Sequence, residues 1–459
     1  MKKLANLSGL FLVWFLTLAT ASSQTSHFVS FNAAQPVLNA YLGSLPAALK
    51  PNGQPTATAW DKWVRDQDKQ IRIRVERGEE DTLTNLLRLG VTYTSQERIS
   101  FSYLERFGKD KYVDSLADKR ADDLIRALAL PHPSEGMLGM RTFLEKQGFN
   151  VRTPDGKKKA KAYMLANLAR MRDEVLRAEK EIYNNKNANL SQQFKDRGIS
   201  TDSNLYPDYM IQAHLRHMME QGLLKPGSIR RVAIVGPGLD FVNKNAGSDF
   251  YPPQTTQPFA VIDALARLKL ADPTTVEVYT FDISSRVNQH VARARSEAAA
   301  GKWYNIQLLS SPSDQWNKDY AADFLDYWQK LGSEIGKPAQ KIPVPEAASD
   351  IWNRAVAVRP AVVLRITPED MNVVFQTVPL AVDKQFDLII GTNIFVYYDG
   401  FEQSLVRANL GTMIKPGGFL ISNELLPAKA PSLLADGLRT EVKVSSNDTE
   451  YMYTYARQK

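Results

Sequence analysis

The chain has 459 residues, which exceeds what one hydrophobic core usually serves, so two domains, or one domain with a large appendage, are expected. Its composition of 44% hydrophobic and 23% charged residues is typical of a globular protein and excludes a disordered or fibrous one. A formal net charge of +7 is too small over this length to indicate nucleic-acid binding, and the absence of cysteine excludes disulfides, thiolate metal sites and cysteine nucleophiles.

The first residues have the features of an export signal. Lys2 and Lys3 precede an apolar stretch over 7–18, and residues 19–21 supply the small side chains that signal peptidase accepts. This stretch is shorter than the roughly 20 residues that a transmembrane helix needs. We therefore predict a signal peptide over 1–21, no stable membrane span after its cleavage, and an exported, periplasmic or secreted protein. The alternative is a buried first helix in a cytoplasmic protein.

Residues 28–224 have the pattern of an all-α region. Apolar residues recur at spacings of three and four over 160–183, which predicts an amphipathic helix with one buried stripe. Proline and glycine clusters punctuate the remainder, and no strand pattern of any length occurs there. His214 and His217 could share a helix face, but no third ligand follows at metal-binding spacing, so no metal site is predicted. We expect a helical N-terminal domain over 28–224.

The pattern changes after the turn residues 225–228. The run 231–235 is continuous and β-branched, as in a buried parallel strand. Further strand-like runs alternate with helical patterns, in the order 276–281, helix 286–300, 386–391, helix 401–414 and 419–422. This alternation predicts parallel βαβ units. The fold class expected for 230–459 is therefore α/β, with a doubly wound, mostly parallel sheet and a partly helical insertion over 301–360.

Glycines and an acid follow the first two strands of this pattern. Gly236 and Gly238 come directly after 231–235, where they allow a ligand to approach the backbone. Asp282 follows the next strand, where its carboxylate can accept both hydroxyl hydrogens of a ribose. A compatible alternative for Asp282 is the N-cap of the helix that begins near residue 284. Because ligands of open α/β sheets bind at the carboxyl ends of the strands, we predict a nucleoside-binding site here.

Two other nucleotide sites are disfavoured. A dinucleotide-binding turn needs a third glycine three positions after the second, but Phe241 stands there and would crowd a pyrophosphate. The GxxxxGK[ST] loop that anchors ATP does not occur anywhere in the chain. Nicotinamide, flavin and ATP are therefore not the expected ligands.

Two segments resemble a known family. Residues 386–398 read FDLIIGTNIFVYY, a strand that runs into an Asn-x-x-x-Tyr segment, and residues 415–424 read KPGGFLISNE, a turn and a strand. Together they resemble motifs IV to VI of the class I S-adenosylmethionine-dependent methyltransferases, with the nearest likeness to the chemotaxis-receptor methyltransferases. The resemblance covers about 230–424 without the insertion.

The resemblance implies a role for each candidate residue. It places Gly236 and Gly238 beside the methionine part of S-adenosylmethionine and Asp282 on its ribose. Asp370 is the candidate for the adenine contact, with helix capping as the alternative. The resemblance also implies that Asn393 and the aromatic segment after it line the methyl-transfer site. There Asn393 would contact the cofactor and orient the acceptor beside Tyr397 and Tyr398. The candidates for the removal of a proton from the acceptor are Asp399 and Glu424.

The sequence departs from the family pattern at two positions. Ile234 stands where the family has an acid for the cofactor's amino end, and Asp240 replaces the usual third glycine. One hypothesis is that Asp240 takes over the contact with the amino end.

Two functions agree with these features. The first is a methyltransferase that acts on an unknown acceptor, either a small molecule or a protein. Export argues against it, because the methyl donor is made and kept in the cytosol. The second is an exported, non-catalytic binding or interaction protein that retains a degenerate methyltransferase fold. Neither function involves nucleic acid.

Overall fold

The computed structural model describes residues 26–184, 198–202, 205–239, 249–310, 319–349, 351–446 and 449–458. The predicted signal peptide over 1–21 lies outside these residues and stays a prediction. Among the helices in the described ranges, none is both long enough and apolar enough to cross a membrane.

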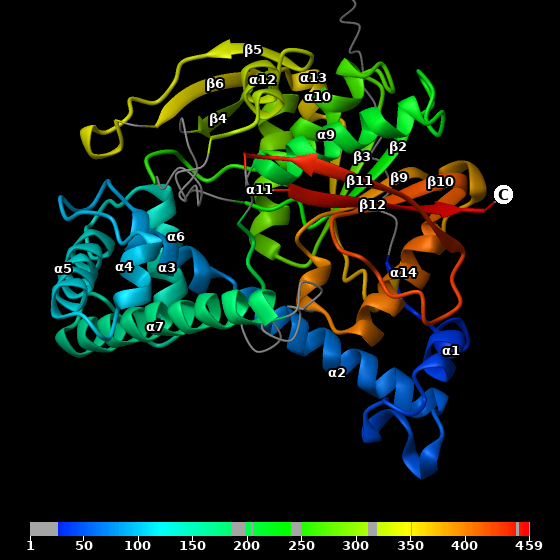
Figure 1. Ribbon diagram of the computed structural model, residues 1–459, viewed down its shortest axis with the longest axis horizontal. Helices are drawn as coiled ribbons and strands as arrows, with labels where there is room; N and C mark the ends of the chain where they lie inside the picture. Colours follow the sequence, from blue (N-terminus) through cyan, green and yellow to red (C-terminus); the bar gives the residue numbers. More distant parts are fainter. Residues whose placement is uncertain are drawn as a thin grey trace, which may run out of the picture.

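A seven-stranded sheet forms the centre of the C-terminal half (Figure 1). Its strands are β2 (Arg231–Val235), β3 (Glu277–Asp282), β7 (Ile366–Asp370), β9 (Phe386–Gly391), β10 (Ile414–Ser422), β11 (Leu434–Lys443) and β12 (Thr449–Arg457). Their order across the sheet is β11-β12-β10-β9-β2-β3-β7. The strands from β10 to β7 pair in parallel, and β12 is antiparallel to both its neighbours. The structure thus confirms an α/β fold with a central, mostly parallel sheet.

The order of the parallel strands is that of a doubly wound nucleotide-binding sheet. Numbered along the chain, they lie in the order 3-2-1-4-5. The C-terminal hairpin of β11 and β12 extends the sheet beside β10, on the side away from β9. The first strand β2 therefore lies between β3 and β9, where the direction of winding reverses.

Helices cover both faces of the sheet. Along β2, Val232 and Ile234 face one apolar core, whereas Ala233 and Val235 face another. The first core contains α9 (Leu205–Glu220), α10 (Gln257–Arg267), α11 (Ser285–Ala299) and α13 (Pro360–Val363). The second contains α1 (Phe31–Ala40), α2 (Ala57–Glu76) and α14 (Gly400–Met413). Apolar packing therefore does not follow the sequence boundary near 225–230, because α1, α2 and α9 pack on the sheet.

The helices from α3 to α7 have a core of their own. These helices are α3 (Glu79–Leu89), α4 (Phe101–Arg106), α5 (Lys111–Leu128), α6 (Glu135–Lys146) and α7 (Pro154–Asn184). Their buried apolar cluster contains only residues between 83 and 168. Figure 1 shows them grouped beside the α/β part. We call α3 to α7 the helical bundle; the amphipathic helix predicted over 160–183 is part of its longest member.

Short elements complete the chain. Strand β1 (His27–Phe28) pairs with β8 (Gln376–Thr377), a contact too short to leave a pattern in the sequence. The 3-10 helices are η1 (Ala47–Leu49), η2 (Pro51–Gly53), η3 (Glu346–Ala348), η4 (Val382–Lys384) and η5 (Phe395–Tyr397).

The insertion over 301–360 contains a second sheet that the sequence did not predict. Strands β4 (Tyr304–Ser310), β5 (Gly336–Ala339) and β6 (Trp352–Val358) pair antiparallel in the order β4-β6-β5, beside α12 (Ala322–Lys330). In the described part of 301–360, helical structure is found in α12, in η3 and at the start of α13. Pro338 masks the pattern of β5, and it is tolerated because β5 is an edge strand.

The chain crosses itself where the helical bundle joins the α/β part. A Cβ atom on Gly78 would lie 1.9 Å from the backbone oxygen of Ile199, and one on Gly198 would lie 2.3 Å from that of Arg77. The Ile199 N–H donates a hydrogen bond to the Arg74 oxygen at 2.8 Å. Glycine is required at both positions because the two backbone segments touch.

Because the two backbone segments touch, a methyl group added at Gly78 should destabilise the folded chain. Gly78→Ala is expected to lower the free energy of unfolding by about 1–3 kcal/mol, because the added carbon overpacks a backbone contact. Gly43→Ala is the matched control, since a Cβ atom there would meet nothing within 4 Å; its expected effect is below about 0.5 kcal/mol. Urea unfolding of both variants measures the difference, and equal effects would contradict a tight crossing.

Candidate functional site

The chain turns sharply after β2. Gly236 and Gly238 have φ angles of 66° and 77°, in the left-handed region that glycine adopts without strain. The Gly236 N–H donates to the Phe281 oxygen at 2.9 Å, which ties the turn to β3. A Cβ atom on Gly236 would lie 3.2 Å from Cδ1 of Ile394. The turn therefore brings bare backbone close to the segment after β9. Asp240 lies outside the described residues, so its role stays a hypothesis.

Asp282 is the last residue of β3 and is buried, with 9% of its surface exposed. Its Oδ1 accepts a hydrogen bond from the Ser284 N–H at 2.7 Å. The N-cap of α11 is Ser284, whose hydroxyl accepts from the Val287 N–H. The alternative prediction that Asp282 caps this helix is wrong, because Asp282 still belongs to the strand.

The environment of Asp282 favours its neutral form. Burial, to which the negative charge of Asp370 adds, raises the pKa of Asp282 from its ordinary value of 3.8 to about 7. Only the hydrogen bonds from the backbone at residues 283 and 284 oppose this shift. A donor that reached the carboxylate would therefore stabilise its ionised form.

The segment after β9 is held by a pair of amides. Asn393 has a φ angle of 57°, and its side-chain oxygen accepts from Asn423 Nδ2 at 2.7 Å. In return, the Asn393 N–H donates to the side-chain oxygen of Asn423 at 2.8 Å. Because Asn423 follows β10, this reciprocal pair joins the ends of two neighbouring strands. It orients Asn393, whose side chain is exposed.

The two tyrosines after Asn393 have different surroundings. Tyr397 and Tyr398 are both buried in the core that α1, α2 and α14 share. Tyr398 also lines the cavity described below, and burial raises the pKa of its phenol well above the ordinary value. Tyr397 does not line that cavity; its backbone oxygen accepts a hydrogen bond from Arg74 at 3.1 Å.

The two candidates for proton removal also lie outside the cavity lining. Asp399 is the N-cap of α14 and forms a capping box with Glu402. Glu424 accepts from the Ser422 hydroxyl at 2.9 Å, and burial raises its pKa to about 7.

One cavity of about 60 Å³ collects most of the predicted residues. Those that line it are Gly236, Gly238, Asp282, Asn393 and Tyr398. The sequence did not predict the other lining residues, which are Val75, Ile199, Ser200, Thr201, Asp202, Pro207, Gln257, Ile283, Thr392 and Ile394. Val75 and residues 199–202 come from α2 and from the chain crossing at Gly78. The N-terminal part of the chain therefore forms one wall of the cavity.

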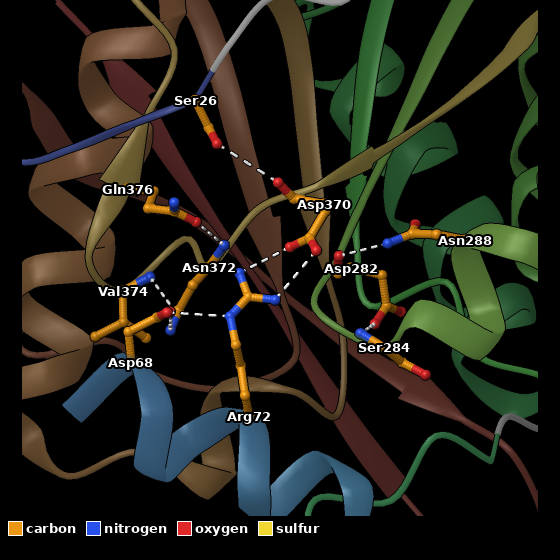
Figure 2. A network of polar contacts seen from close by, with 10 residues as sticks. All are labelled: Ser26, Asp68, Arg72, Asp282, Ser284, Asn288, Asp370, Asn372, Val374 and Gln376. Carbon is orange, nitrogen blue, oxygen red and sulfur yellow. Dashed lines mark hydrogen bonds and ion pairs between the residues drawn. The ribbon is translucent and has the colours of Figure 1, made fainter. Parts of the chain in front are cut away.

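Asp370 lies next to this cavity. It is the last residue of β7 and pairs in register with Asp282 (Figure 2). Its carboxylate forms an ion pair with Arg72 of α2. The alternative prediction that Asp370 caps a helix is wrong, because a turn and the short strand β8 follow it.

A cleft of about 700 Å³ lies between α6 and α11 and reaches Asp370. Val75 and Ile283 line both this cleft and the smaller cavity, so the two spaces are neighbours.

Gln257 is the most informative residue that the sequence did not indicate. It begins α10, and its Nε2 donates to the Thr392 hydroxyl at 3.0 Å. Its Oε1 is buried and has no hydrogen-bond partner among the described residues. A buried acceptor without a donor costs about 1–3 kcal/mol, which a ligand donor would recover. The sequence signal is weak, since only the start of a helix after the glycine turn points to this position.

The raised pKa of Asp282 predicts a pH-dependent stability. Between about pH 4 and pH 7 the folded chain keeps a proton on Asp282 that the unfolded chain releases. Its contribution to stability therefore falls as the pH rises through this window. Relative to the wild type, Asp282→Asn should gain about 1 kcal/mol or more over the same window.

Urea unfolding at several pH values measures this difference. Glu424 titrates in both proteins, so its contribution cancels in the comparison. The matched control is Asp326→Asn on the exposed side of α12, which loses only a surface ion pair with Lys330 and should differ from the wild type by about 0.5 kcal/mol or less. A constant difference between Asp282→Asn and the wild type would refute the raised pKa.

Comparison with known proteins gives similarity to solved structures only. No protein-family model matches the chain, and no curated protein matches it. The chain is similar to magnesium protoporphyrin IX methyltransferase from Synechocystis PCC 6803 with bound SAM, at 12% identity and a TM-score of 0.26, over 61% of this chain and 89% of that one. A TehB-like SAM-dependent methyltransferase from Corynebacterium glutamicum matches at 9% identity and a TM-score of 0.25, over 61% and 99%.

A third similar structure is the glycopeptide N-methyltransferase MtfA complexed with SAM. It matches at 12% identity and a TM-score of 0.20, over 55% of this chain and 68% of that one. These TM-scores are low, so the fold and the site are assigned from the strand order and the cavity of this chain.

Proposed function

We propose that the chain binds S-adenosylmethionine between Gly236 and Asp282 and transfers its methyl group to an acceptor. One observation carries the proposal: the glycine turn after β2, the carboxylate that ends β3 and the Asn393 segment after β9 line a single cavity. That cavity lies at the carboxyl ends of the parallel strands, where open α/β sheets bind their ligands. The order of the parallel strands, 3-2-1-4-5 along the chain, is also that of a doubly wound nucleotide-binding sheet.

The residues present fit the two ends of this cofactor. Asp282 has acceptor positions left for two ribose hydroxyls, because a carboxylate offers about four. Gln257 has an unpartnered Oε1 in the same cavity, which suits the ammonium group of the methionine end. In this proposal Gln257 supplies the acceptor that Ile234 cannot supply. The finer likeness to chemotaxis-receptor methyltransferases stays a prediction.

The size of the cavity adds a requirement. Small-molecule sites usually enclose roughly 300–1,000 Å³, whereas this cavity measures about 60 Å³. Binding therefore requires one wall to move. The wall formed by Val75 and residues 199–202 is the candidate, because its residues come from outside the sheet and its loops.

In the proposed reaction the main task of the protein is to align the acceptor with the methyl group. When bound, the cofactor supplies an activated methyl group on a sulfonium. Holding an acceptor in line with such a group corresponds to effective molarities of about 10⁵ M or more in good cases. Asn393 is oriented by Asn423 and can hold an acceptor by hydrogen bonding. Tyr398 can attract the cationic sulfur with its ring, at about 1 kcal/mol.

A second candidate function is the binding of an adenosyl ligand without methyl transfer. The narrow cavity and the missing acid at Ile234 favour it. Export, which stays a prediction from residues 1–21, also agrees with this candidate because the methyl donor is kept in the cytosol. Incubation with labelled S-adenosylmethionine and a mixture of candidate acceptors separates the two: label in a product supports catalysis, and binding alone supports the second candidate.

Calorimetry with S-adenosylhomocysteine tests the ligand itself. The wild type should bind, and Asp282→Ala and Gln257→Leu should each weaken binding by roughly tenfold or more, since each loses hydrogen bonds to a charged group. The matched control Asp326→Ala lies on the exposed side of α12 and should bind like the wild type. Binding should also release protons near pH 6.5, because the ribose hydroxyls favour the ionised form of Asp282. Equal affinities for all four proteins would contradict the proposed site.

A further inference from the structure

A closed ring of polar contacts joins helix α2 to the end of β7 (Figure 2). Arg72 donates from Nη1 and Nη2 to the two carboxylate oxygens of Asp370, at 3.1 and 2.8 Å. Its Nε donates to Oδ2 of Asp68, one helical turn earlier, at 3.0 Å. Asn372, two residues after Asp370, donates to Oδ1 of Asp68 at 2.9 Å. Each of the three nitrogens of the Arg72 guanidinium therefore donates to a carboxylate.

Asp68, which Asn372 holds in turn, fixes the orientation of the Arg72 side chain. Asp68 and Asn372 are buried, with 8% and 1% of their surfaces exposed. Asn372 is held in turn by Gln376 and by the Val374 N–H. A planar guanidinium bound by two carboxylates has little freedom to rotate. Arg72 thus presents a fixed fork to Asp370, whose side chain remains 55% exposed.

Asp370 lies where the base of the nucleoside in the proposed function would reach. Across the sheet, the glycine turn after β2, Asp282 at the end of β3 and Asp370 at the end of β7 follow one another. A ligand whose methionine end lies at the glycines and whose ribose lies at Asp282 directs its base toward β7. A carboxylate only accepts hydrogen bonds, and Arg72 takes two of the roughly four acceptor positions. The remaining acceptor positions of the Asp370 carboxylate can face the cleft that Asp370 lines.

We infer that Arg72 is a positioning residue for base recognition: it holds Asp370 so that its free acceptor positions receive the exocyclic amino group of adenine. This inference rests on the proposed function and extends it, because α2 lies outside the segments that resemble methyltransferases. The ligand class is then an adenine nucleoside. A hypoxanthine nucleoside presents a carbonyl oxygen in place of the amino group, and that oxygen would face the carboxylate.

The test compares S-adenosylhomocysteine with S-inosylhomocysteine by calorimetry on the full chain. The wild type should prefer the adenosyl ligand by roughly tenfold or more, the effect of one hydrogen bond to a charged group. Arg72→Met should bring the ratio of the two affinities close to one, and Arg72→Lys should retain part of the preference. Asp370→Asn should abolish or invert it, since an amide can donate to the carbonyl. A purely structural role for Arg72 would weaken both ligands equally and leave the ratio unchanged.

Arg65→Met is the matched control, because Arg65 is exposed on the same helix and its guanidinium lies over the Phe28 ring, 5.0 Å from the ring centroid. It should keep the wild-type ratio. Thermal unfolding shows whether Arg72→Met folds, and Asp370→Asn tests the inference if it does not. An unchanged ratio in Asp370→Asn or in folded Arg72→Met, or a wild type that binds both ligands equally, overturns the inference alone. A wild type that binds neither ligand overturns the proposed function together with it.

Discussion

Parallel pairing of β2 with β3 and β9 is the constraint on which the site depends. The register places Val235 opposite both Phe281 and Gly391, so the three strands end at one level. The residues that follow them emerge at one edge of the sheet, although they are distant in sequence. Both faces of β2 are buried, so a slip by one residue would exchange its side chains between the two cores and disturb the packing of both. The chemistry of the site follows from which residues stand at those strand ends.

The N-terminal residues complete the site from the other side. Helix α2 packs on the sheet with α1 and α14 and carries both Val75, in the wall of the cavity, and Arg72, on Asp370. The chain crossing at Gly78 brings residues 199–202 to the same wall. The helical bundle has a separate core, so it is attached to the ligand site without being part of the sheet's packing. One helix therefore carries both a residue of the wall that must move and the arginine that pairs with Asp370.

The sequence predicted β2, β3, β9 and β10 of the central sheet but not β7, β11 or β12. Strands β2 and β9 have the predicted bounds, because continuous apolar runs between turn residues are distinctive when a strand is buried on both faces. Asp282 was found from its place at the end of a predicted strand, and Asp370 from the family resemblance. The capping alternative for each residue was wrong, because helix α11 begins after Ser284 and no helix follows Asp370. Gln257 and Arg72 were missed, since their importance comes from partners 135 and 298 residues away. Strands β4 and β6 were missed for the same reason, because residues 304–310 pair with residues 352–358.

In the proposed function, one adenosyl ligand spans the space between Gly236 and Asp282. A crystal structure of the chain with S-adenosylhomocysteine tests it most directly. Both ribose hydroxyls should lie within hydrogen-bond distance of the Asp282 carboxylate, and the amino acid end should lie against the glycine turn and Gln257. Val75 and residues 199–202 should be displaced outward. A ligand bound elsewhere, or a cavity that stays closed at saturating ligand, would contradict it.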